Sequence, residues 1–327
     1  MQVFNQNDEE NKTNNTNENK KVKTSSLFPE NQIHSSTSLK LKLFFFLFGF
    51  IGLQVIATIV SVFFMRSKMD SDAVSFWINF LSYTICIATV IAVIFSLKSK
   101  PWKILLSELK SWKVYAFGAG VVIIMYLINI IFSLMYKNIP NYNENMNQSA
   151  INQMITKNPL FSALSFFEIV LFAPVIEELT YRFGLGGLIV GKKKRFVVAI
   201  LVSSLIFGLI HFNGLTIQMT KLEAEIFHKA GESGNSSLLQ LAESLNFTGF
   251  ANGITEASYN SFIGHLNILM RNEWLNLPIY IISGACLGSA YFFSGKLSSS
   301  IFGHALNNLL SYVFMFVPSG AMILFSF

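Results

Sequence analysis

The stretch LFSALSFFEIVLFAPVIEELTY, residues Leu160–Tyr181, decides what kind of protein this sequence encodes. It is almost entirely apolar, and a helix of about 20 such residues crosses the hydrocarbon core of a bilayer. Three carboxylates nevertheless stand within it: Glu168, Glu177 and Glu178. Because a charge inside a bilayer costs about 2.5–3.5 kcal/mol on insertion scales, an intramembrane carboxylate favours a functional explanation. The stretch therefore predicts a transmembrane helix that carries part of a functional site.

The rest of the chain has the same apolar character. Of its 327 residues, 52% are hydrophobic and 13% charged, and 33 are Phe. Soluble domains have about 25% charged residues, so this composition excludes an ordinary soluble protein and a disordered one. We predict an all-α, polytopic membrane helix bundle of about seven transmembrane helices. The predicted spans are Leu43–Phe64, Val74–Leu97, Val114–Tyr136, Leu160–Tyr181, Phe196–Phe212, Leu277–Phe293 and Ser299–Val317.

Changes in polarity along the chain divide it into regions. We expect residues 1–38 to be a disordered polar tail, 39–159 a region of three spans, and 318–327 an apolar C-terminal tail. The core is expected at 160–317. A polar insert, 213–276, interrupts it, and we predict one or two amphipathic helices there, outside the membrane and apart from the chemistry.

The positive charges favour one orientation in the membrane. Lys and Arg gather before the first span and between spans two and three, four and five, and six and seven, as in the cluster Lys192–Arg195. Cytoplasmic loops carry such an excess, which places the N-terminus inside. The net charge of +6 is thus explained by topology, and no nucleic-acid partner is expected. Cys86 and Cys286 both lie in apolar runs and predict neither a disulfide framework nor a metal cluster.

Helical spacing assigns relations to the ionisable residues in the spans. Glu178 and Arg182 are four residues apart, so their side chains share a face and can pair. Glu177 points about 100° away from Glu178 and is left to face a cavity. Two further pairs repeat the four-residue spacing on other spans: Phe207 with His211, and His304 with Asn308.

These groups are sufficient for amide hydrolysis. A carboxylate and a nearby His can hold and deprotonate a water molecule, which here predicts Glu177 with His211. A His N–H and an Asn amide can donate to the oxyanion that forms on attack, which predicts His304 with Asn308. Glu177, His211 and His304 could instead bind a catalytic zinc ion, and the sequence does not separate the two mechanisms. Glu168 either lines a substrate path or is paired locally.

The three motifs resemble those of one known family. EELTYR at Glu177–Arg182 matches EExxxR, FGLIH at Phe207–His211 matches FxxxH, and HALNN at His304–Asn308 matches HxxxN. Their order on apolar helices, over roughly residues 160–312, resembles the CPBP family, which includes CAAX prenyl endopeptidases and the bacteriocin-processing or self-immunity (Abi) proteins. The resemblance implies an intramembrane endopeptidase with Glu177, His211, His304 and Asn308 as catalytic residues. Glu178, Arg182 and Phe207 would support them.

The substrate expected is a membrane-associated protein or peptide, lipidated or secreted. The Asn-, Lys- and Phe-rich composition favours an AT-rich bacterial genome and a bacterial plasma membrane. Because bacteria generally lack prenylated proteins, a secreted peptide such as a bacteriocin precursor is preferred.

Two other functions remain as alternatives: a non-catalytic immunity or scaffold protein, and a proton-coupled transporter. Other protease classes fit less well. The three Asp residues lie outside the spans, HExxH is absent, and the one GxSG match, at Gly231–Gly234, lies in the insert.

Overall fold

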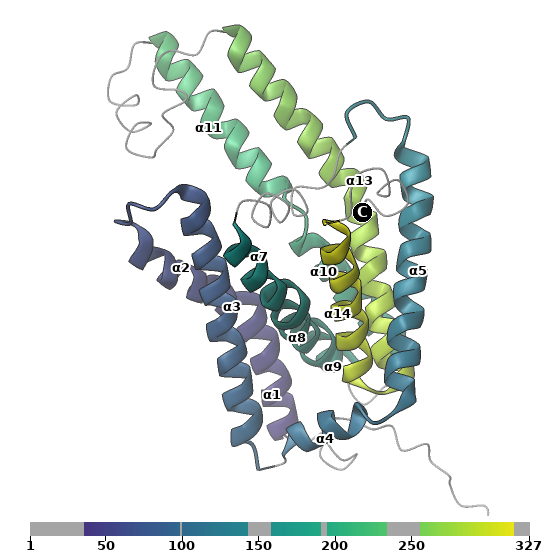
Figure 1. Cartoon of the computed structure of the whole chain (residues 1–327). Coiled ribbons are helices and arrows are strands. Elements are labelled where there is room, and N and C mark those ends of the chain that lie inside the picture. Colours follow the sequence, from purple (N-terminus) through teal and green to yellow (C-terminus); the bar gives the residue numbers. More distant parts are fainter. Residues whose placement is uncertain (1–35, 99, 143–157, 191–194, 234–255, 317–327) are drawn as a thin grey trace, which may run out of the picture.

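The computed structural model describes residues 36–98, 100–142, 158–190, 195–233 and 256–316. These residues form helices, turns and short connections, with no strand among them, which confirms the all-α prediction (Figure 1). Residues 1–35 of the predicted N-terminal tail (1–38) lie outside the described residues, and so does the whole predicted C-terminal tail (318–327). Six described helices are long and apolar enough to cross a membrane: Ser38–Phe64, Ala73–Ser96, Trp112–Tyr136, Pro159–Val190, Phe196–Ile226 and Glu256–Ser294.

The seventh predicted span is a helix of a different kind. It is α14, Leu297–Phe314, whose 18 residues reach about 27 Å. Three consecutive buried serines, Ser298–Ser300, and buried His304 make it more polar than the other six. It packs lengthwise against α5 (Trp112–Tyr136) and also contacts α13 (Glu256–Ser294), so the protein shields its polar groups. The described part of the bundle therefore has six apolar spans and one polar inner helix.

The first half of the chain forms one flank of the bundle. It consists of α1 (Ser36–Leu47), the π-helical turn η1 (Phe48–Gly52), α2 (Leu53–Phe64), α3 (Ser71–Ser96), the short α4 (Pro101–Glu108) and α5. Large apolar side chains on α2, α3 and α5 are exposed, as a lipid-facing surface requires. Lys42 of α1 donates from Nζ to the carbonyl of Gly187 at 3.2 Å. This bond brings a cation to the C-terminal end of the helix 159–190, where the helix dipole favours it.

The helix 159–190 is irregular, and its irregularity has identifiable causes. It runs through α7 (Pro159–Phe166), η2 (Phe167–Phe172), α8 (Ala173–Glu178), η3 (Leu179–Gly186) and α9 (Gly187–Val190), where both η segments are π-helical. Pro174 has no N–H for the helical ladder, which accounts for the wide turn just before it. We expected the span to end at Tyr181, but the helix continues because Gly184 lets it approach α1: a Cβ there would lie 2.8 Å from the Phe46 amide nitrogen.

The polar insert is largely an extension of the spans on either side. Past α10 (Phe196–Ile210) the chain continues as α11 (Gly214–Ser233), and α13 begins at Glu256, some twenty residues before the predicted start of its span. In Figure 1, α11 and the first half of α13 extend together beyond the rest of the bundle. Residues 256–260 of the predicted insert are thus already helical, while 234–255 lie outside the described residues.

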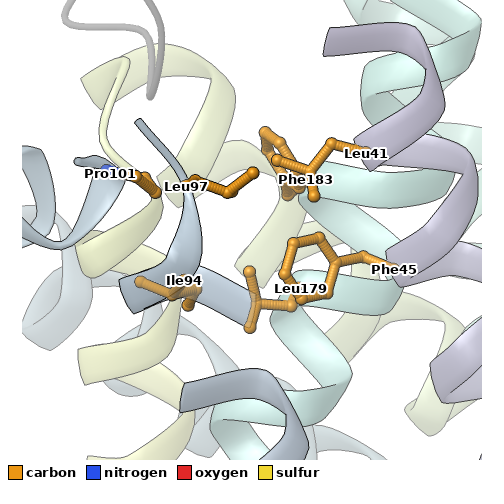
Figure 2. Close-up of a pocket in the computed structure, with 7 residues that line it drawn as sticks. All are labelled: Leu41, Phe45, Ile94, Leu97, Pro101, Leu179 and Phe183. Carbon is orange, nitrogen blue, oxygen red and sulfur yellow. The ribbon is translucent and has the colours of Figure 1, made fainter. Parts of the chain in front are cut away.

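Close helix contacts set the core around the site. Gly284 and Gly288 on α13 face α10, and a Cβ at Gly284 would lie 3.1 Å from Ser204 Cα. The GxxxG pattern at 284–288 thus permits close helix packing. A separate apolar cluster joins α1, α3, η3 and α14, and Figure 2 shows a small recess within it. Its lining is entirely apolar: Leu41, Phe45, Ile94, Leu97, Pro101, Leu179 and Phe183. The recess is a packing feature with no chemical group.

Glu108 is a buried carboxyl outside the spans, and its ionisation tests how α4 packs against α14. Its side chain is 1% exposed, and Oε2 accepts from the Ser298 N–H at 3.0 Å, at the start of α14. Burial raises the pKa of this carboxyl above its usual range, although the hydrogen bonds from Ser298 and the charge of Lys296 oppose the rise. Folding therefore takes up a proton between the ordinary and the raised pKa, and the stability that Glu108 contributes falls as the pH rises through that window.

We expect the protein in detergent to melt at a higher temperature at about pH 5 than at about pH 7, with a smaller difference in Glu108→Gln. Glutamine can still accept from Ser298 but cannot ionise. Thermal melting followed by intrinsic fluorescence measures the effect. The exposed variant Glu225→Gln should keep the wild-type difference, and an unchanged difference in Glu108→Gln would contradict the assignment.

Candidate active site

The structure brings three of the predicted site residues together from three helices. Glu177 lies near the end of α8, His211 directly follows α10, and His304 lies within α14. Glu177 Oε2 is 4.0 Å from His211 Nε2 and 3.9 Å from His304 Nε2. The side chains of Glu177 and His211 keep 17% and 25% of their surface exposed, so the cluster is enclosed without being sealed.

The partners of the two histidines fix which nitrogen of each faces Glu177. His211 Nδ1 lies 2.8 Å from the carbonyl oxygen of Phe207, and His304 Nδ1 lies 3.0 Å from Glu178 Oε1. A carbonyl or carboxylate oxygen only accepts, so each Nδ1 carries the proton and donates. Both Nε2 atoms therefore face Glu177 Oε2. Each presents a lone pair there when its ring is neutral and an N–H when its ring is protonated.

Glu178 connects the site to the framework of the bundle. Its carboxylate is fully buried and pairs with Arg182 Nε at 3.0 Å, which confirms the pair predicted from the four-residue spacing. It also accepts from the Ser300 hydroxyl and from His304. Arg182 is equally buried and reaches Ser203 of α10 through Nη1 at 3.4 Å. This network joins the helix 159–190 to α10 and α14.

Phe207 forms the apolar wall of the site. Its ring is 4% exposed and lies 4.4 Å from the His211 ring and 6.0 Å from the His304 ring, measured between centroids. The Arg182 guanidinium lies over the same ring at 5.1 Å. The FxxxH motif is therefore explained by packing: Phe207 contacts both imidazoles, and its backbone carbonyl orients one of them.

Asn308 lies one turn beyond His304 on α14, as its spacing predicted. Its Nδ2 donates to the carbonyl of Ile169 at 2.8 Å. Ile169 belongs to η2, where the wide π-helical turn alters the regular backbone ladder. A carboxamide has two N–H groups, so one is occupied by Ile169 and the other can serve a second acceptor.

Several groups around the site could not be found by motif or local spacing. The Tyr280 ring of α13 lies against the His211 ring in a tilted arrangement, with the ring centroids 5.2 Å apart. Glu273, fully buried, accepts from the Asn213 N–H at 3.0 Å and holds the break between α10 and α11, two residues after His211. Both belong to or adjoin the region predicted to be a separate insert. The bond from Glu273 to Asn213 lies within residues 213–276, so the expectation that the insert stands apart from the chemistry stays a prediction.

The residues suggested for zinc do not have the spacing of ligands to one ion. Two ligands at about 2.05 Å from a tetrahedral zinc lie about 3.3 Å apart, shorter than the 3.9 and 4.0 Å found here. Within the part of the chain that the structure describes, no group of three or more His, Cys, Asp or Glu has the arrangement of a metal site. A separation near 4 Å between polar atoms instead suits a shared water molecule.

Residues 159–310, just under half of the chain, match the family of type II CAAX prenyl endopeptidases, described as Rce1-like. This segment contains all three motifs and every residue of the converging cluster. The match supports the resemblance to the CPBP family of intramembrane proteases that the sequence motifs indicated, and the matched family is one of peptidases. No curated protein and no solved structure matches the chain.

We expect Glu178→Ala and Arg182→Ala each to destabilise the protein strongly, because each leaves its partner as a lone buried charge. Breaking a buried pair in this way costs about 3–5 kcal/mol. The measurement is accumulation in membranes and thermal unfolding in detergent. The double variant should lose less stability than the sum of the two single losses. Normal thermal stability of both single variants would show that the pair does not support the fold.

Proposed function

We propose that this protein is an intramembrane endopeptidase that hydrolyses a peptide bond of a membrane-associated protein or peptide. The observation that carries the proposal is the convergence of Glu177 Oε2 with the Nε2 atoms of two histidines inside an apolar bundle. Glu177 Oε2 is buried and has no hydrogen-bond partner among the described residues. Buried polar groups in proteins are normally satisfied, so this oxygen is suited to a bound reactant.

The first chemical step is activation of water. A water between Glu177 and His211 donates its two hydrogens to Oε2 and Nε2, which leaves an oxygen lone pair for the substrate carbonyl carbon. As the carbon–oxygen bond forms, Glu177 takes one proton. It then gives that proton to the amide nitrogen when the carbon–nitrogen bond breaks. The products are a carboxylic acid and an amine, and Glu177 returns to its starting state.

His304 and Asn308 stabilise the oxyanion that forms during attack. For this role His304 must carry protons on both nitrogens, and Glu178 at 3.0 Å from Nδ1 favours that imidazolium. With His304 charged, the two carboxylates of Glu177 and Glu178 balance the cations of Arg182 and His304, so the buried cluster is neutral. The second N–H of Asn308 supplies the other donor.

The substrate and location follow from general considerations about the chain. A site enclosed by apolar helices suits a peptide that is already in the membrane, whether lipidated or secreted. The composition supports a bacterial plasma membrane, where a peptide such as a bacteriocin precursor is a natural substrate. The family match supports CAAX-protease-like chemistry over residues 159–310.

We expect Glu177→Gln to lower the rate of peptide cleavage by at least about 10²-fold, because the amide cannot take the proton from water. The variant should insert and accumulate like the wild type. Purified protein in liposomes and a membrane-anchored, fluorescence-quenched peptide measure the rate, and comparison of membrane peptides from cells with each form identifies natural substrates. Glu225→Gln, on the exposed face of α11, is the matched control. Full activity of Glu177→Gln would contradict the assignment of Glu177 as the group that takes the proton from water.

The metal-free scheme is tested separately. We expect cleavage to survive exhaustive treatment with a chelator, because the Glu177 and histidine atoms are spaced for a shared water. Elemental analysis of the active protein is the second measurement. Stoichiometric zinc that is lost in His304→Ala, together with activity abolished by chelation and restored by zinc, would establish the metal mechanism instead.

A further inference from the structure

Glu168 is an intramembrane carboxylate that the proposed chemistry does not use. Four carboxylates are more than nine-tenths buried in the part of the chain that the structure describes: Glu108, Glu168, Glu178 and Glu273. The other three each accept a hydrogen bond within the protein. Glu168, 8% exposed, has neither a hydrogen bond nor an ion pair among the described residues. An unpaired carboxyl at this depth is costly, and such groups usually face a functional partner.

Helix register places Tyr83 of α3 opposite Glu168. The two helices run in the same direction: Phe76 stacks on Phe161 at 4.1 Å, and farther along both helices Val90 packs in one cluster with Leu179. Tyr83 lies seven residues after Phe76, and Glu168 lies seven residues after Phe161. Seven residues are almost two full turns, so both side chains stay on the faces that are in contact.

The π-helical segment η2 brings Glu168 toward the side on which Glu177 lies. The two are nine residues apart, and in a regular helix that is two and a half turns, which would put them on opposite faces. Residues Phe167–Phe172 wind more slowly because their turn is wider. In agreement, the Tyr83 hydroxyl is within electrostatic range of both carboxylates, Glu168 and Glu177. The axial separation of the two carboxylates is about 13 Å.

We propose that Glu168 and Tyr83 form a substrate subsite that takes a basic side chain, Lys or Arg, of the peptide being cleaved. The carboxyl pairs with the cation, and the Tyr83 oxygen accepts a further hydrogen bond from it. An extended peptide advances about 3.3 Å per residue, so a subsite about 13 Å from Glu177 serves a residue roughly two to four positions from the scissile bond.

This subsite rests on the proposed endopeptidase function and adds a specificity element to it. Tyr83 lies outside the matched segment 159–310, so part of the selection would come from the first half of the chain. The ligand class follows from charge. A carboxylate enclosed by apolar walls favours a cation over a neutral or acidic side chain, and the ionic hydrogen bond is worth on the order of tenfold to 100-fold in affinity.

The test uses purified full-length protein in liposomes and palmitoylated, fluorescence-quenched peptides. One Lys is moved through the second to fourth positions on each side of the scissile bond, in a background of Leu and Ala, with norleucine as the uncharged counterpart. We expect kcat/KM for the best Lys peptide to exceed that of its norleucine counterpart by tenfold or more. Glu168→Gln should remove this advantage and leave cleavage of the norleucine peptide within about twofold. Tyr83→Phe should reduce the advantage in part.

Three results would overturn the subsite: no advantage for Lys at any position, equal losses on both peptides in Glu168→Gln, or an unchanged advantage in that variant. Equal losses would indicate a structural role or a proton path. Binding to Glu177→Gln protein, followed by fluorescence anisotropy, separates the two proposals. If the wild type cleaves no peptide, the endopeptidase function fails. The subsite is still decided by whether the Lys peptide binds more tightly than the norleucine peptide and whether adding Glu168→Gln abolishes the difference.

Discussion

The buried carboxylate of Glu178 is the constraint on which the site depends. It is fully enclosed and must be neutralised where it stands, because a lone charge in this environment is too costly to keep. Arg182 supplies the opposite charge from the same helix, while Ser300 and His304 supply donors from α14. Satisfying one carboxylate therefore fixes the relative position of two helices, and Arg182 extends the constraint to α10 through Ser203. The orientation of His304 follows from this structural requirement.

The neighbouring residues Glu177 and Glu178 have different surroundings because successive side chains on a helix point about 100° apart. Glu178 points into the protein and is saturated with partners, whereas Glu177 points toward the two histidines and keeps an unsatisfied oxygen. Both histidines are held through Nδ1, one by a carboxylate and one by a backbone carbonyl. These are the partners that orient metal-bound histidines in other proteins, so their presence alone does not distinguish zinc from water. Here the separations of 4.0 and 3.9 Å between Glu177 Oε2 and the two Nε2 atoms support the proposed water scheme.

Local spacing in the sequence was enough to predict the spans, the Glu178–Arg182 pair and the faces of the motif helices, because each depends on neighbouring residues along one helix. It was not enough to predict contacts between helices. The bond between Glu178 and His304 joins residues 126 positions apart, and the loss of one Asn308 N–H to Ile169 depends on a π-helical turn. The insert does contain helices, as expected, but its mixed polarity hides that they continue the neighbouring spans.

The groups assigned to the chemistry and part of the protein that encloses them come from different regions of the chain. The converging side chains of Glu177, His211 and His304 and their supports all come from residues 159–310, the segment that matches the protease family. The first three spans carry none of the motifs, yet α1 and α3 pack closely on the helix that bears both glutamates. The contact at Gly184 fixes α1, and the stacking of Phe76 on Phe161 fixes α3. Because these contacts bring Tyr83 beside the helix 159–190, the proposed subsite would let variation in the first half of the chain change which peptides are admitted, while Glu177 and His211 stay unchanged.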